Sequence, residues 1–147
     1  MRVSGLPLGA SFFEARLRST LRCTVCGHES IKHESFCDVH LNIDTVRTLP
    51  EALHQFVAWE RLDGDNCWHC ERCDARVPAF KGCAFETLPR LLLLVLKRYS
   101  YSSATTRRKL RHRVALPSIL SMAEYRYHQP LHTFHNLEAS RRGATTA

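Results

Sequence analysis

Two Cys-x-x-Cys pairs constrain this chain more than any other feature of its sequence. Cys23 and Cys26 form the first pair, Cys70 and Cys73 form the second, and 43 residues separate the pairs. Each pair is a short chelating turn, and four thiolates can hold one tetrahedral zinc ion with bonds of about 2.3 Å. A shared ion would join parts of the chain that are far apart in sequence. We therefore expect a structural zinc site in a metal-stapled, mostly β fold.

The remaining cysteines leave alternatives open. Cys67 and Cys70 make a third Cys-x-x-Cys, so Cys67 competes with Cys73 for a place in the second pair. The paired cysteines could also be unliganded, because free cysteine packs as a small hydrophobe. Cys37 and Cys83 fall on apolar faces of predicted strands, and we expect both in the core. None of the unpaired cysteines lies in a recognisable nucleophile loop, so we expect no catalytic residue in this chain.

The composition indicates one globular unit in a reducing compartment. A chain of 147 residues can bury a real core, and its net charge of +7 permits an acidic or a nucleic-acid partner. Seven cysteines, an odd count, argue against a secreted disulfide framework. The first ten residues make a poor signal peptide, and the apolar run from Leu91 to Leu96 is too short to span a membrane. We expect an intracellular location, cytoplasmic or nuclear, and no membrane partner.

Hydrophobic periodicity outlines several strands and one short helix. Alternation predicts a strand from Phe12 into the first cysteine pair, another from Cys37 to Ile43, and a weaker one from Val77 to Phe85. The segment Leu91 to Tyr99 is almost continuously apolar, which predicts a strand buried on both faces. Thr48-Leu-Pro-Glu51 fits a capping box at the start of a helix.

The histidines and a basic run could each belong to a binding site or simply be solvated. Three histidines near the end of the chain have the spacing of a metal cluster: His128, His132 and His135. Pro130 would break a helix between the first two, so we favour solvated histidines. His28 and His69 flank the cysteine pairs and could support or replace a ligand. The basic run 107–113 could contact phosphate, but its strand-like period favours a solvated loop.

Taken together, these motifs resemble the catalytic domain of the ubiquitin-specific proteases, the large family of cysteine-type deubiquitinases. Six segments carry the resemblance in the order in which the family has them: Phe13–Cys23, Glu34–Ile43, Leu53–Gly64, Trp68–Cys73, Leu88–Tyr99 and Lys109–Leu120. In the fourth, an aromatic residue precedes the cysteine pair, as in the family. This match favours Cys70 and Cys73 over Cys67.

The resemblance implies an α+β, mostly β fold: zinc-ribbon fingers plus part of the palm of a papain-like cysteine protease domain. Residues 12–127 would form this partial domain, between termini 1–11 and 128–147 that we expect to be disordered. A structural Zn²⁺ would be held by the four cysteines of the two pairs, Cys23, Cys26, Cys70 and Cys73. In the family, the fingers cradle ubiquitin, and a Cys-His-Asp/Asn triad hydrolyses the bond after ubiquitin's C-terminal glycine.

The sequence departs from the family in one important way. The nucleophile box, a Gly-Asn-Thr-Cys-Tyr pattern, and the Gly-His-Tyr histidine box have no counterpart here. We therefore expect part of a deubiquitinase that is inactive alone, with no other cofactor. Its expected partners are ubiquitin, ubiquitinated proteins and the remaining parts of the protease domain.

Two alternatives come from other functional classes. The chain could be a non-catalytic ubiquitin-binding or scaffold module, although incomplete sheets leave strand edges that favour aggregation. It could also be a nucleic-acid-binding zinc ribbon, which the positive charge supports. We favour nucleic acid less as a partner, because the predicted strands lack an aromatic platform interleaved with Lys and Arg.

Overall fold

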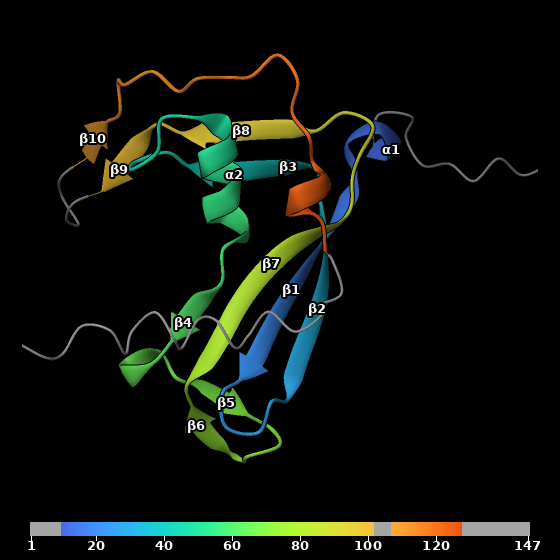
Figure 1. Cartoon of the computed structure of the whole chain (residues 1–147), viewed down its shortest axis with the longest axis vertical. Coiled ribbons are helices and arrows are strands. Elements are labelled where there is room, and N and C mark those ends of the chain that lie inside the picture. Colours follow the sequence, from blue (N-terminus) through green and yellow to red (C-terminus); the bar gives the residue numbers. More distant parts are fainter. Residues whose placement is uncertain (1–9, 102–106, 128–147) are drawn as a thin grey trace, which may run out of the picture.

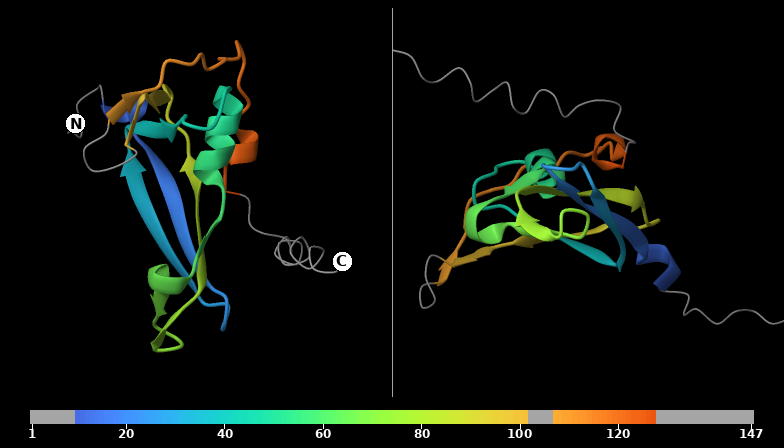
Figure 2. Two further views of the ribbon diagram at one scale, coloured as in Figure 1. Left: turned by 90° about the vertical axis from the view of Figure 1, so that its left-hand side faces the viewer. Right: turned by 90° about the horizontal axis from the view of Figure 1, so that it is seen from below.

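The computed structural model describes residues 10–101 and 107–127, in which strands predominate. The elements in chain order are α1 (Ala10–Phe13), β1 (Ala15–Cys23), β2 (Glu29–Phe36), β3 (Asp38–Asn42), α2 (Leu49–Val57), β4 (Glu60–Leu62), η1 (Gly64–Asn66), β5 (Trp68–Cys70), β6 (Ala75–Val77), β7 (Ala79–Thr87), β8 (Leu93–Lys97), β9 (Tyr99–Tyr101), β10 (Arg107–Lys109) and η2 (Ala123–Tyr125). A long sheet extends as an arm from a body that contains α2, β3 and β8 (Figures 1 and 2). None of the helices in these ranges has the length and apolar character needed to cross a bilayer.

The arm is an antiparallel sheet with the strand order β2-β1-β7-β4. Its centre is the pair of nine-residue strands β1 and β7, which run side by side from the body to the tip. The small hairpin of β5 and β6 lies at the tip, beyond the short edge strand β4 (Figure 1). The arm therefore carries both cysteine pairs at the end farthest from the body.

The core lies in the body, where α2 packs against β3 and the base of β7. The predicted capping box is present: the Thr48 hydroxyl accepts the Glu51 N–H, and the Glu51 carboxylate accepts the Thr48 N–H. These contacts satisfy N–H groups that lack partners within the helix. Leu49 and Leu53 on α2 then pack with buried Phe85 of β7.

The predicted strands at 37–43 and 91–99 form a parallel pair, β3 and β8. Val39 and Leu41 of β3 are buried, as the alternation predicted. The prediction that the second strand is buried on both faces is wrong, because Leu93 is 50% exposed. Within the described residues β8 pairs with β3 alone, and only one of its faces, with Leu94 and Leu96, packs on the core.

Other predictions need correction at element boundaries. Phe12 lies in the helical turn α1, and the strand predicted from this residue begins at Ala15. Cys37 is exposed and not in the core, because it occupies the bend between the end of β2 and the start of β3. Cys83 is half-buried on β7, and its thiol donates a hydrogen bond to the Phe56 carbonyl at 3.2 Å. The weak strand predicted over 77–85 is present as β7, slightly shifted.

Candidate metal centre

The first cysteine pair forms a tight turn between β1 and β2. Cys23 ends β1, and its carbonyl accepts the Gly27 N–H at 3.2 Å, while its N–H donates to the His28 carbonyl at 2.9 Å. Gly27 has φ +70°, a left-handed conformation that a residue without Cβ adopts at little cost. The turn therefore folds back on itself and brings Cys26 beside Cys23.

The second cysteine pair makes a similar turn between β5 and β6. Cys70 ends β5, and Asp74, the residue after Cys73, has φ +47°. Asp74 thus holds the position that Gly27 holds in the first turn, directly after the second cysteine of its pair. Asp tolerates the left-handed conformation better than most residues. Periodicity did not indicate this role, but the shared position in the two motifs could have done so.

The register of the arm places the two turns next to each other. Cys23 lies opposite Ala79, the first residue of β7, which follows β6 closely. Thr24 binds the Pro78 carbonyl twice, through its N–H at 3.1 Å and its hydroxyl at 2.8 Å. The hydrogen bonds between β1 and β7 therefore join the cysteine turns even though 43 residues separate them in sequence.

Four sulfur atoms converge where the turns meet. The Sγ atoms of Cys23 and Cys73 are 3.8 Å apart, those of Cys26 and Cys70 are 3.6 Å apart, and all four lie within 4.8 Å of one another. Zinc–sulfur bonds of about 2.3 Å give a tetrahedron whose edges are about 3.8 Å long. The four sulfurs therefore fit the coordination sphere of one zinc ion.

Backbone amides stabilise negative charge in this cluster. The N–H groups of Cys26 and Val25 point to the Cys23 sulfur at 3.4 Å and 3.3 Å. The Cys26 N–H, with further hydrogen bonds, lowers the pKa of Cys23 to about 6, whereas hydrogen bonding to the Cys26 side chain and burial raise the pKa of Cys73 to about 12. Because the four thiols are so close, ionisation of one disfavours ionisation of the others. A divalent cation favours the thiolate form of every ligand it binds.

The other candidates near the turns lie outside this cluster. Cys67 is half-buried and lines an open groove of about 570 Å³, and its carbonyl accepts from the Arg76 guanidinium at 3.1 Å. The His28 ring stacks on Trp68 with 6.2 Å between ring centroids, and His69 Nε2 lies 3.8 Å from the Asp74 carboxylate. The four sulfurs that gather are those of Cys23, Cys26, Cys70 and Cys73. His128, His132 and His135 lie outside the described residues.

No catalytic cysteine is evident in the described part of the chain. Burial raises the pKa of the Cys83 thiol, which disfavours the nucleophilic thiolate. Cys37 and Cys67 have no thiol hydrogen bond to a described histidine, and a catalytic cysteine needs such a base. His40, three residues after Cys37, is hydrogen-bonded to the Asp38 carboxylate at 3.0 Å and not to the Cys37 thiol.

Sequence comparisons find relatives of this chain among known proteins. The family model for ubiquitin carboxyl-terminal hydrolase matches residues 7–138. Ubiquitin carboxyl-terminal hydrolase 47 of Homo sapiens is 35% identical over 120 residues, which are 77% of this chain and 9% of that protein. Ubiquitin C-terminal hydrolase 15 of Oryza sativa subsp. japonica is 38% identical over 114 residues, which are 77% of this chain and 11% of that protein.

Solved structures show the same similarity in three dimensions. One is the SAGA Ubp8/Sgf11/Sus1/Sgf73 DUB module bound to ubiquitin aldehyde, with a TM-score of 0.71 and 30% identity over 80% of this chain and 26% of the matched one. Another is a SAGA DUB module bound to monoubiquitin, with a TM-score of 0.72 and 30% identity over 82% and 29% of the two chains. The chain thus spans about a tenth of the length of these two curated relatives and over a quarter of the length of these two solved chains. On this evidence of sequence and fold, the chain belongs to the ubiquitin-specific protease family of ubiquitin carboxyl-terminal hydrolases.

Proposed function

We propose that this chain forms the zinc-stapled fingers and part of the palm of a deubiquitinase. The observation that carries the proposal is the cluster of four sulfurs at tetrahedral distances on the tip of the arm. One zinc ion bound by Cys23, Cys26, Cys70 and Cys73 would lock the β5–β6 hairpin onto the end of β1. Its role is structural, because all four ligand positions are filled by protein sulfur.

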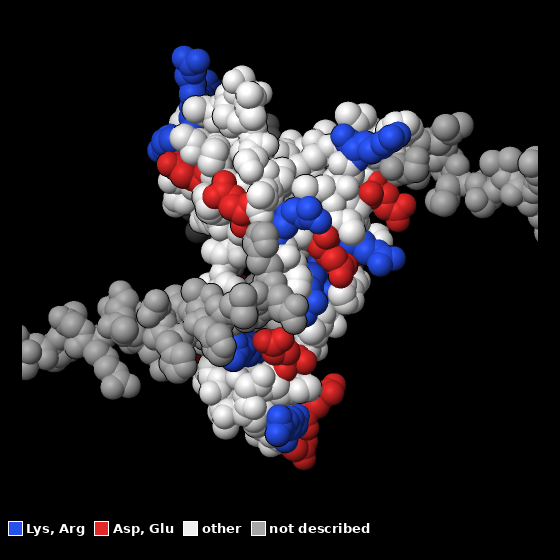
Figure 3. Space-filling view, turned by 45° about the vertical axis from the view of Figure 1, so that its right-hand side comes forward, with Lys and Arg blue, Asp and Glu red and all other residues white. Residues whose placement is uncertain are grey.

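The arm is the part of the chain proposed to hold the globular body of ubiquitin. Two matched structures carry ubiquitin or ubiquitin aldehyde, which supports ubiquitin as the partner. The arm is a four-stranded sheet with mixed charges along it, fixed to the body by β1 and β7 (Figure 3). Zinc at its tip would keep this surface rigid, so that binding costs less conformational entropy.

The complete protein would hydrolyse the bond after ubiquitin's C-terminal glycine. We propose that the 147-residue chain alone does not, because none of its described cysteines has the base that would make it a nucleophile. Ubiquitin binding and bond hydrolysis would then be separable in this protein. Its free thiols also fit a reducing cytoplasmic or nuclear location.

The deciding experiment is a titration of ¹⁵N-labelled ubiquitin with the purified chain, with zinc content measured on the same sample. We expect about one zinc per chain and saturable shifts on the globular face of ubiquitin. A folded chain that holds zinc but causes no shifts would reject the ubiquitin-cradling role. A folded chain without zinc would reject the metal site.

A ubiquitin–fluorophore hydrolysis assay tests the catalytic part of the proposal. We expect no turnover by the chain. Turnover that disappears in Cys37→Ala, Cys67→Ala or Cys83→Ala would show that a nucleophile is present here. Turnover that survives all three changes would indicate a contaminating protease.

A further inference from the structure

The net positive charge of this protein comes from one part of the sequence. Residues 87–123 contain eight Lys and Arg and no Asp or Glu. The rest of the chain has 13 basic and 14 acidic side chains, so it is almost neutral. The net charge of +7 therefore comes from a single segment and not from a generally basic surface.

The fold places the β9–β10 hairpin of this segment, with the residues next to it, at one end of the body (Figure 1). β9 pairs with β10, so that Tyr99 lies opposite Lys109, and the Leu110 N–H donates to the Arg98 carbonyl at 2.7 Å. The Arg98 guanidinium also donates to the His112 carbonyl at 2.6 Å, which holds the following residues against β8. This end lies opposite the tip that carries the four cysteines (Figure 1).

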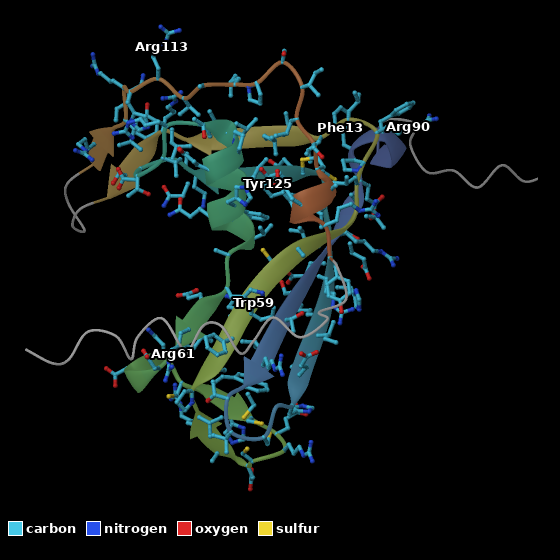
Figure 4. The ribbon with its side chains drawn as sticks, viewed as in Figure 1. Phe13, Trp59, Arg61, Arg90, Arg113 and Tyr125 are labelled. Atoms are coloured by element: carbon cyan, nitrogen blue, oxygen red, sulfur yellow. The ribbon has the colours of Figure 1, made fainter. Side chains whose placement is uncertain are left out.

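We define the basic end by five exposed side chains, Lys97, Arg108, Lys109, Arg111 and Arg113. Arg113 extends away from the body into solvent (Figure 4). Apart from Arg108, none of the five has an acidic partner among the residues that the structure describes. Four cations are thus left without a carboxylate in this part of the protein.

Arg108 of the basic end already pairs with a carboxylate of this chain. Its guanidinium lies 3.3 Å from the Asp44 carboxylate, whose second oxygen accepts the Ser100 hydroxyl at 3.2 Å. Asp44 comes from the loop after β3, so the hairpin already holds a carboxylate supplied by another segment. Arg pairs well with carboxylates because its planar donors match their two oxygens.

We propose that the basic end docks an acidic segment of a partner polypeptide, whose closely spaced Asp and Glu pair with Lys97, Lys109, Arg111 and Arg113. The contact with Asp44 favours carboxylates. The described part of this end offers one exposed aromatic, Tyr99, whereas binding of single-stranded nucleic acid uses a series of stacking side chains. This surface lies at the end of the structure opposite the cysteine-bearing tip of the arm (Figure 1).

The test uses the whole chain and a fluorescein-labelled oligoglutamate peptide, with binding followed by fluorescence anisotropy at low salt. We expect saturable binding that weakens as salt rises, because a Debye length of about 10 Å at 0.1 M screens exposed charges. A triple variant reverses three charges of the basic end: Lys109→Glu, Arg111→Glu and Arg113→Glu. We expect it to raise Kd about tenfold or more, with retained folding checked by circular dichroism.

A matched control separates a local site from net charge. It reverses three exposed cations of the arm: Lys32→Glu, Arg61→Glu and Lys81→Glu. Lys32 and Arg61 pair with Glu34 and Asp63, so retained folding of this control is also checked by circular dichroism. We expect Kd for oligoglutamate to change less than threefold in this control. An equal loss in both variants would overturn the proposal, as would saturable binding that does not depend on salt.

Two further measurements keep the outcome clear if charge reversal disturbs folding. The neutral variant Lys109→Gln, Arg111→Gln and Arg113→Gln must also weaken binding. A single-stranded oligonucleotide of equal charge must bind more weakly than oligoglutamate, and tighter oligonucleotide binding would overturn the assignment to an acidic polypeptide. Ubiquitin titration of the variants at Lys109, Arg111 and Arg113 tests the arm separately, so failure of oligoglutamate binding leaves the proposed role of the arm intact.

Discussion

The indole of Trp59 lies directly on the backbone of Gly82. A Cβ atom placed on Gly82 would be 2.7 Å from Cδ2 of Trp59 and 2.9 Å from its Cε3. Gly82 is in the middle of β7, and Trp59 precedes the edge strand β4, which pairs with the same part of β7. The absence of a side chain at Gly82 thus lets a large ring cover the centre of the arm (Figure 4).

We predict that Gly82→Ala destabilises the protein by about 1–3 kcal/mol, because the added methyl group overpacks a position already filled by the ring. Urea unfolding measures the change. The double variant Gly82→Ala, Trp59→Ala should recover part of the loss relative to the two single variants. Strictly additive effects would show that the ring does not limit the size of the residue at this position.

Several features of the fold follow from local sequence. The two Cys-x-x-Cys pairs predicted a four-sulfur cluster, and Trp68 helped to choose Cys73 over Cys67. The capping box before α2 was predictable because four consecutive residues define it. In both cases the chemistry depends on residues close together in the chain.

What could not be predicted depends on neighbours distant in sequence. β2 is an exposed edge strand without clear alternation, so its pairing with β1 was not visible in its own residues. The apolar sequence of β8 indicated burial on both faces, but burial depends on which strands pair with it. The Trp59–Gly82 contact is likewise set by the tertiary fold.

The two cysteine turns have the same left-handed backbone position, occupied by Gly27 in the first turn and by Asp74 in the second. This difference in residue type predicts opposite effects of substitution. Gly27→Ala should destabilise the protein by about 1 kcal/mol, because a residue with a Cβ is strained at positive φ. No atom lies near that Cβ, so the cost is conformational and not steric. Asp74→Gly should be neutral or stabilising by up to about 1 kcal/mol. Thermal unfolding of the zinc-loaded variants measures both, and equal losses would contradict this account.

The capping carboxylate of α2 predicts a dependence of stability on pH. Hydrogen bonds from the Arg47 and Thr48 N–H groups hold the pKa of Glu51 below its usual value of 4.5. A lowered pKa in the folded state stabilises the protein above pH 4.5, and this contribution is lost as the pH falls through the folded pKa. We expect Glu51→Gln to be less stable than the parent at pH 7, with a difference that narrows below pH 4.5. A constant difference from pH 7 to pH 3 would exclude this role.

The choice between Cys67 and Cys73 can be tested by zinc content. Cys73→Ser should lose zinc, because its sulfur is one of the four that converge, 3.8 Å from that of Cys23. Cys67→Ser is the matched control and should keep about one zinc per chain, since its sulfur lies outside the cluster. Atomic absorption on the purified variants measures the metal.

The same two variants show what the metal contributes to folding. Binding energy at a structural zinc site is largely folding energy, so Cys73→Ser and a strong chelator should each unfold at least the tip of the arm. Loss of amide dispersion for the two turns would report this by NMR, while the capping box and α2 in the body should stay ordered. Zinc retention in Cys73→Ser but not in Cys67→Ser would instead place Cys67 in the site and require the β5–β6 hairpin to shift its register.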